Sequence, residues 1–345
     1  VKVRKKRRRK DQVCQLKAVF SRRLMSDRRP RRSVRHILIV CVIRNLIATR
    51  SLRETRRHVF ASLTMGACLS SPTPSGTESG NAKPPADEPS GLDASEAAFL
   101  LSWRENDAKL GKHWAGDEPP EYWRGVTTNG ANVRDLNLPG IGLSSIPSDI
   151  SRLSKLEVLD LAENGLSGPL PQALGSLPEL RELRLEENGF SGGLPEEWEN
   201  LAKLTHLNLS GSPLTMPEGL PAKLLAKLTS MEDLQFSGAK IPKVPYHVCC
   251  MKDLSKLVMS DCGVTTIDDA IAECEALAIV VFSGNLLETV PRGLCDLRQL
   301  EILDFSNNPN LKTVSSEFEE LEFKVQGQLR MEFDDHVEFE EEEEA

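Results

Sequence analysis

The sequence predicts an α/β solenoid of about eight repeats with short parallel strands, and three observations support this fold class. Apolar residues occupy the first, fourth and sixth positions of a segment that recurs along the chain, and the ninth position is often Asn. Successive copies begin 23 to 27 residues apart, and a fixed period of this kind indicates stacked supersecondary units. The alternating fourth and sixth positions indicate a strand that buries one face. The copies begin at Val133, Leu156, Leu180, Leu204, Met231, Leu254, Leu277 and Leu300.

Residues 1–64 differ in composition from the rest of the chain. They hold 21 of the 43 Lys and Arg residues with only three acids, a net charge of +18, whereas the remainder carries −26. Three interpretations are open: a basic arm for nucleic acid or nuclear import, an Arg-rich organelle presequence, or upstream sequence read in frame that is not native protein. We favour the third because of the motif that follows. The acidity of the remainder argues against nucleic acid as its ligand.

A lipidated flexible tether is predicted for residues 65–94. Met65-Gly66-Ala67-Cys68-Leu69-Ser70 fits the myristoylation pattern, in which Gly66 becomes the acylated N-terminus. One myristoyl chain binds membranes only marginally, so palmitoylation of Cys68 is the expected second signal. The alternatives are an internal Met-Gly without meaning and an unmodified thiol. The Pro-, Ser- and Gly-rich segment that follows cannot bury a core, and Ser71 and Thr73 precede prolines as candidate phosphorylation sites.

An N-terminal cap is predicted for residues 95–132, since a repeat array exposes its core at each end. Residues 95–103 form an amphipathic pattern for which Asp93 or Ser95 is a suitable N-cap. Trp114 and the segment Tyr122-Trp123-Arg124-Gly125-Val126 follow and supply apolar bulk.

The array itself is predicted for residues 133–321. The buried Asn amide of each copy can donate to and accept from the backbone where the coil bends, and Cys262 can do so in part. Ile141, Ser212 and Ala239 depart from the pattern. The extra residues 220–227 are expected to bulge or to lengthen a helix on the convex side. Periodicity fades after Leu321, and residues 322–345 are expected to be a C-terminal cap remnant and an acidic tail.

This pattern resembles the leucine-rich repeat L-x-x-L-x-L-x-x-N/C-x-L over about 190 residues. Leu166-Ser167-Gly168 looks like the L-x-G variant of plant receptor-type repeats. The cap is similar to the plant-type cap C-x-W-x-G-V-x-C, with Glu121 and Thr128 at the two cysteine positions. The resemblance implies a right-handed horseshoe with its strands on the concave face and a role in protein binding.

Neither catalysis nor metal binding is indicated by the side chains. The eight cysteines form no disulfide framework, which favours a reducing compartment. His247, Cys249 and Cys250 lack a second ligand pair at zinc spacing. When the residues are assigned to positions of the repeat, no nucleophilic side chain falls beside a base. We therefore expect no enzyme activity, no cofactor, no metal and no small-molecule substrate.

The concave face is the predicted binding surface, because the residues between the inward leucines point outward. Its N-terminal half is mostly charged and its C-terminal half carries a contiguous apolar patch, which usually marks a partner. We expect a protein partner that has a basic and an apolar patch. The concave set is Asp160, Glu182, Arg184, Glu186, His206, Asn208, Asp233, Lys256, Val258, Ile279, Val281, Ile302 and Asp304.

The sequence thus predicts a non-catalytic scaffold of intracellular signalling, held at the cytoplasmic side of a membrane by its lipid anchor. One alternative is a receptor-type extracellular recognition domain, against which the missing cap cysteines speak. The other is a soluble adaptor of the cytosol or an organelle.

Overall fold

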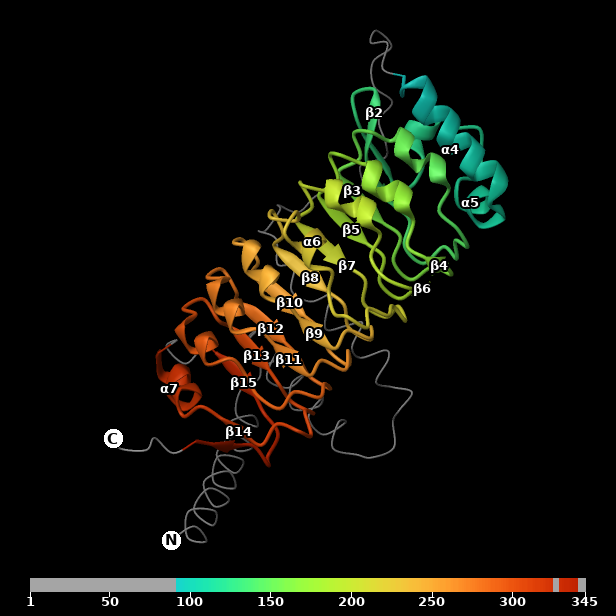
Figure 1. Ribbon diagram of the computed structural model, residues 1–345. Coiled ribbons are helices and arrows are strands. Elements are labelled where there is room, and N and C mark those ends of the chain that lie inside the picture. Colours follow the sequence, from blue (N-terminus) through green and yellow to red (C-terminus); the bar gives the residue numbers. More distant parts are fainter. Residues whose placement is uncertain (1–90, 325–328, 341–345) are drawn as a thin grey trace, which may run out of the picture. The chain divides into compact units, whose positions relative to one another are not determined.

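The computed structural model describes residues 91–324 and 329–340, and within them the chain forms one continuous coil of repeats (Figure 1). The predictions for residues 1–64, for Gly66 and Cys68, and for Ser71 and Thr73 lie outside these residues. No helix in the described ranges is long and apolar enough to cross a membrane.

A ten-stranded main sheet runs the length of the coil. The first two strands pair antiparallel and all later neighbours pair in parallel, each strand next to the strand of the following repeat. We call the solvent-facing side of this sheet the concave face. In order, the strands are β1 (Val126–Asn129), β2 (Asn132–Asn137), β3 (Val158–Asp160), β5 (Glu182–Arg184), β7 (His206–Asn208), β8 (Asp233–Gln235), β10 (Lys256–Val258), β12 (Ile279–Val281), β13 (Ile302–Asp304) and β15 (Arg330–Glu332).

Short helical turns of successive repeats stack along the side of the coil away from the main sheet (Figure 1). Each 3₁₀ turn from η2 to η5, and again η7, begins directly after a proline at the N-cap position, where the missing N–H leaves no helical hydrogen bond unmade. The long repeat instead has an α-helical turn within its extra residues, and this turn spans four residues against five in each neighbouring 3₁₀ turn, so the helix is not lengthened. The turns are η2 (Ser148–Arg152), η3 (Gln172–Ser176), η4 (Glu196–Asn200), α6 (Ala222–Leu225), η5 (Tyr246–Cys250), η6 (Asp269–Glu273), η7 (Arg292–Asp296) and α7 (Glu317–Lys324).

Three two-stranded sheets join neighbouring repeats on the remaining side of the coil. They pair β4 (Ser167–Pro169) with β6 (Gly189–Ser191), β9 (Lys243–Val244) with β11 (Thr266–Ile267), and β14 (Thr313–Val314) with β16 (Glu338–Phe339). Between these layers and the main sheet lies one hydrophobic core made of the repeated leucines and their substitutes.

The N-terminal cap consists of α4 (Ala94–Asn106), α5 (Ala108–His113), η1 (Pro120–Tyr122) and β1. Asp93 caps α4 by accepting from the backbone N–H of Ser95 and Glu96. The buried carboxylate of Glu96 accepts from the N–H of Val133 at 2.6 Å and so ties the cap to the first repeat. The rings of Trp114 and Trp123 stack with centroids 4.5 Å apart. The stacking within the cap and the Glu96 bond to the first repeat hold the cap in place.

The C-terminal boundary of the array differs from the expected residue 321. β15 pairs with β13 in the register of the preceding repeats, and β16 pairs with β14. Asp334 takes over the accepting part of the repeated Asn's role, since its carboxylate accepts from the N–H of Asn307 at 2.9 Å and of Asn308 at 3.0 Å. Residues 329–339 therefore form a further coil rather than part of an acidic tail.

Candidate functional site

A ladder of buried asparagines fixes the bends that place the concave side chains. Asn285 accepts from the backbone N–H of Cys262 and Val264, and its amide donates to carbonyls of its own and the preceding repeat. Asn164, Asn188 and Asn308 make the same kinds of bond. Cys262 substitutes in part, because its thiol donates to the carbonyls of Phe236 and Ser260.

The register of the main sheet brings together the predicted concave residues from β3 to β13. Residues two apart on a strand point to the same face, and each aligns with its counterpart on the next strand. His206 lies between Glu182 and Asp233, and Asn208 lies between Arg184 and Gln235. Nearly all of the set is half-buried, and Arg184 is exposed.

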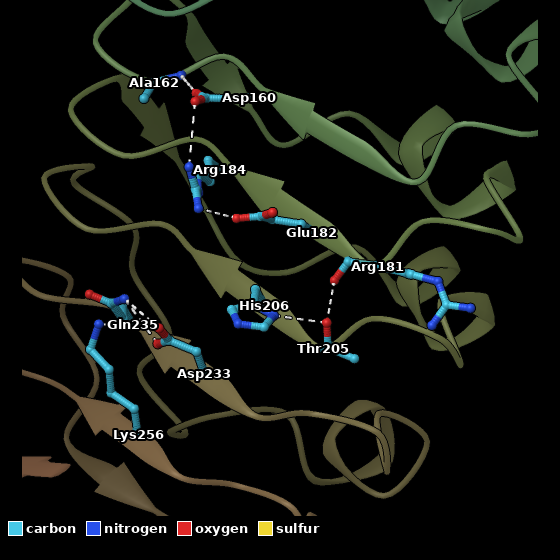
Figure 2. Close-up of polar contacts among 10 residues, drawn as sticks. All are labelled: Asp160, Ala162, Arg181, Glu182, Arg184, Thr205, His206, Asp233, Gln235 and Lys256. Atoms are coloured by element: carbon cyan, nitrogen blue, oxygen red, sulfur yellow. Dashed lines mark hydrogen bonds and ion pairs between the residues drawn. The ribbon is translucent and has the colours of Figure 1, made fainter. Parts of the chain in front are cut away.

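The polar half of this face, from β3 to β8, is paired internally (Figure 2). The guanidinium of Arg184 contacts the carboxylates of both Glu182 and Asp160. Lys256 extends back from β10, and its ammonium lies 3.1 Å from the carboxylate of Asp233. These bridges offset much of the negative charge that the sequence suggested, so the polar half is an alternating lattice of charges rather than a uniformly acidic patch.

Gln235 and Thr205 are two members of this network that the sequence analysis did not single out. The Gln235 amide donates to the Asp233 carboxylate at 2.9 Å, and its side chain is almost fully buried between neighbours. Thr205 hydrogen-bonds the ring Nδ1 of His206 at 2.8 Å and donates to the carbonyl of Arg181 (Figure 2). The repeat frame identifies Gln235, because it holds the same outward position as Asn208 and Val258.

Glu186 is the exceptional carboxyl of the site. It follows β5, and its Oε2 atom is buried with no hydrogen-bond partner among the described residues. Burial raises its pKa to about 7, an effect that the charges of Asp160 and Glu163 reinforce and that of Arg184 opposes. Near neutral pH this carboxyl therefore changes its charge, unlike an exposed glutamate.

The apolar half lies on β10, β12 and β13. Ile279 aligns with Ile302 and Val258 aligns with Val281, so the four side chains form two adjoining pairs. All four are half-buried on the outward face. Asp304 borders them next to Val281, and desolvation by burial raises its pKa.

Cys249, Cys250, Cys262 and Cys274 are free thiols, of which Cys262 and Cys274 are buried and Cys249 and Cys250 are half-buried. Cys295 is buried. Burial raises the pKa of both Cys262 and Cys274 to about 12, which leaves their thiols protonated. Residues 91–324 and 329–340 contain no group of three or more His, Cys, Asp or Glu side chains that could hold a metal ion.

The leucine-rich repeat family model matches residues 131–190. The Protein STRUBBELIG of Arabidopsis thaliana is 35% identical over 66 residues, which are 18% of this chain and 9% of that protein. The chain therefore spans less than a tenth of the length of that relative.

Among solved structures, a plant ice-binding protein superposes with a TM-score of 0.55 at 21% identity, over 72% of this chain and 81% of that one. The ectodomain of the Arabidopsis receptor kinase HAESA, solved with an IDA peptide hormone ligand, gives a TM-score of 0.50 at 21% identity, over 64% of this chain and 44% of that one. At this identity the two structures show the fold alone. The chain is a leucine-rich repeat solenoid, and it is 37% identical to the LRR receptor-like serine/threonine-protein kinase GSO2 of Arabidopsis thaliana over 79 residues, which are 22% of this chain and 6% of that protein.

Proposed function

We propose that the chain is a non-catalytic protein-interaction scaffold, held at the cytoplasmic face of a membrane by N-terminal acylation, that binds a protein partner on its concave face. The observation that carries this proposal is the apolar half beside the charge lattice on one continuous sheet. Apolar contacts at the centre with a polar surround are the usual anatomy of a protein interface. The peptide hormone held by the related HAESA ectodomain also supports a polypeptide ligand.

The partner that fits this surface has an apolar patch flanked by basic side chains. The apolar contacts come from Val258, Ile279, Val281 and Ile302. Full burial of an exposed side chain of this size contributes roughly 1.5–3 kcal/mol, and these four contribute part of that range because they are already half-buried. Glu163 and Glu187 are exposed beyond the ends of β3 and β5, where they can attract cations and raise the association rate. The paired carboxylates of the polar half contribute less to this attraction.

Val281→Asp tests the concave surface. We expect the variant to fold, because this side chain points away from the core, and to lose binding at least tenfold, since it places a second carboxylate beside Asp304. The measurement is photo-crosslinking in cells from a reactive residue at position 258, with circular dichroism as the check of folding. Tyr246→Asp, an exposed site on η5, is the matched control. If folded Val281→Asp gives the same crosslinked product as the wild type, the partner does not bind through the apolar half of the concave face.

Membrane anchoring rests on the Met65-Gly66 motif and on Cys68. Gly66→Ala should shift the protein from the membrane to the soluble fraction, because the acylated amine is lost, and Cys68→Ser should do so in part. Cell fractionation with immunoblotting measures the shift, and Ser70→Thr, which keeps the motif, is the control. Native peptides recovered from residues 1–64 would argue for the basic arm or the presequence instead.

A receptor-type extracellular domain is the second candidate, favoured by the similarity to the LRR receptor-like kinase GSO2 over 79 residues. Free thiols and a cap without its cysteine pair are more usual in reducing compartments, which supports the cytoplasmic proposal. Glycosylation at Asn208 within Asn208-Leu209-Ser210 would favour the extracellular alternative.

A further inference from the structure

The last strand of the main sheet, β15, has one unpaired edge within the described residues. The N–H of Arg330 donates to the carbonyl of Glu301, and the carbonyl of Glu332 accepts from Phe305, so both residues turn their backbone groups toward β13. Backbone groups of alternate residues point to opposite sides of a strand. The N–H and C=O of Met331 therefore face outward along the open edge.

An apolar rim accompanies this open edge. Met331, Phe333, Val337 and Phe339 pack against the core and are only half-buried. Phe333 is the last member of a row of rings: it stacks on Phe305 at 5.9 Å, and Phe305 stacks on Phe282 at 5.9 Å. Unpaired backbone next to incompletely buried rings is the combination that favours the addition of another strand.

We propose that a second copy of this chain occupies the edge, through antiparallel pairing of two β15 strands about a two-fold axis at Met331. Each interface then presents the same residues to the other copy, as a two-fold dimer requires. In this register Met331 pairs with Met331 of the second copy, and both exchange N–H···O=C bonds because their backbone groups face the edge. The main sheets of the two copies become continuous.

The charges of β15 are self-complementary in that register. Arg330 lies opposite Glu332 of the second copy, and Glu332 lies opposite Arg330 of the second copy. These are the pairs without backbone hydrogen bonds, in which side chains approach most closely. Arg330 and Glu332 occupy the positions of Ile302 and Asp304, so both project on the concave face where they can meet their counterparts. Within one copy they already form an ion pair at 2.6 Å.

The charges around the edge set the strength of the dimer and distinguish it from other occupants. Asp335, Glu338 and Glu340 are exposed at the same end, and they repel their counterparts in a second copy. Salt screens this repulsion between separated exposed carboxylates more than it screens the two close pairs of Arg330 with Glu332, so the dimer strengthens as ionic strength rises. A basic segment of another protein would show the opposite salt dependence. The alternating charges of β15 favour a strand with the reverse alternation, which a second copy supplies.

Sedimentation velocity of the full chain tests the proposal, at concentrations from about 1 to 100 μM and at low and high salt. We expect a species of 38.2 kDa to convert to one of twice that mass, and more completely in high salt. Arg330→Glu should weaken the dimer at least about tenfold, because two attractive cross-strand pairs become repulsive. The charge swap Arg330→Glu with Glu332→Arg should restore it. Arg134→Glu is the matched control, since Arg134 also pairs with a neighbouring carboxylate but lies on β2, between two strands.

A wild-type chain that stays monomeric at every concentration and salt would overturn the proposal. So would a dimer that weakens with salt, a dimer that persists in Arg330→Glu, or a charge swap that fails to restore association. Because the swap keeps the ion pair within each strand, a folding defect of the single variant cannot produce the expected pattern.

Discussion

Replacing Asn285 with alanine is expected to lower the free energy of unfolding by about 3–5 kcal/mol, because two buried donors and two acceptors lose their partner together. Its Oδ1 atom accepts from Cys262 N at 3.0 Å and from Val264 N at 2.9 Å. Its Nδ2 atom donates to the carbonyls of Met259 at 2.7 Å and Phe282 at 2.9 Å. The side chain is 1% exposed, so water cannot replace these bonds without opening the coil.

Asn164→Ala is the matched control for this prediction. Asn164 makes bonds of the same kinds at the first turn of the array, yet it is only half-buried, so water can satisfy part of what is lost. We expect Asn164→Ala to lower the free energy of unfolding by at most about half as much as Asn285→Ala. Urea unfolding followed by circular dichroism measures both variants. If both variants lose the same free energy of unfolding, the burial of an asparagine does not determine how much it stabilises the array.

The second large effect is a loss of stability with rising pH that depends on Glu186. Its folded pKa is about 7, above the ordinary 4.5, so the folded state binds more protons than the unfolded state between these values. Stability is therefore highest when the carboxyl is protonated, and it falls as pH rises from about 4.5 to 7, by up to about 3 kcal/mol.

Glu186→Gln should remove this pH dependence, because the amide is neutral throughout. We expect the variant to be more stable than the wild type at pH 8 and close to it at pH 5, measured by chemical denaturation across the pH range. Glu187→Gln, at an exposed neighbouring position, is the control and should leave the profile intact. A wild-type profile that is flat between pH 5 and 8 would contradict the buried position of Glu186.

The sequence predicts the array well because one rule repeats at each copy. Alternation of apolar residues predicts which strand positions point inward, and the strand register of β3 to β13 follows it. The coil of residues 329–339 does not follow this rule. Its register aligns Met331 with Leu303, 28 residues apart, which is a longer spacing than any in the predicted array, and Glu332, Asp334 and Asp335 give it the composition of a tail. Its pairing depends on a neighbouring edge that no local pattern reveals.

The polar half shows the second limit of sequence reasoning. The repeat frame predicts that Glu186 and Arg184 share a face with Asp160 of the preceding repeat. It does not predict that Arg184 bridges two carboxylates or that the Glu186 carboxyl is enclosed, because rotamers and burial depend on side chains of neighbouring repeats. The sequence therefore predicts which charged residues lie on the concave face, but not which of them form ion pairs or which carboxyl has a raised pKa.

The gap in the asparagine ladder has a mechanical consequence. Ser212 and Ala239 occupy the ladder positions of the two coils that carry β7 and β8, and the Ser212 hydroxyl has no partner among the described residues. These two successive coils therefore lack the asparagine cross-link, and the Ser210 hydroxyl, which accepts from the Ser237 N–H at 3.2 Å, joins them by a different side-chain bond. We therefore expect the array to bend more easily in this segment, which lies between the ion pairs of β5 and the apolar residues of β10. Bending there changes the angle between the two halves of the concave face without breaking either.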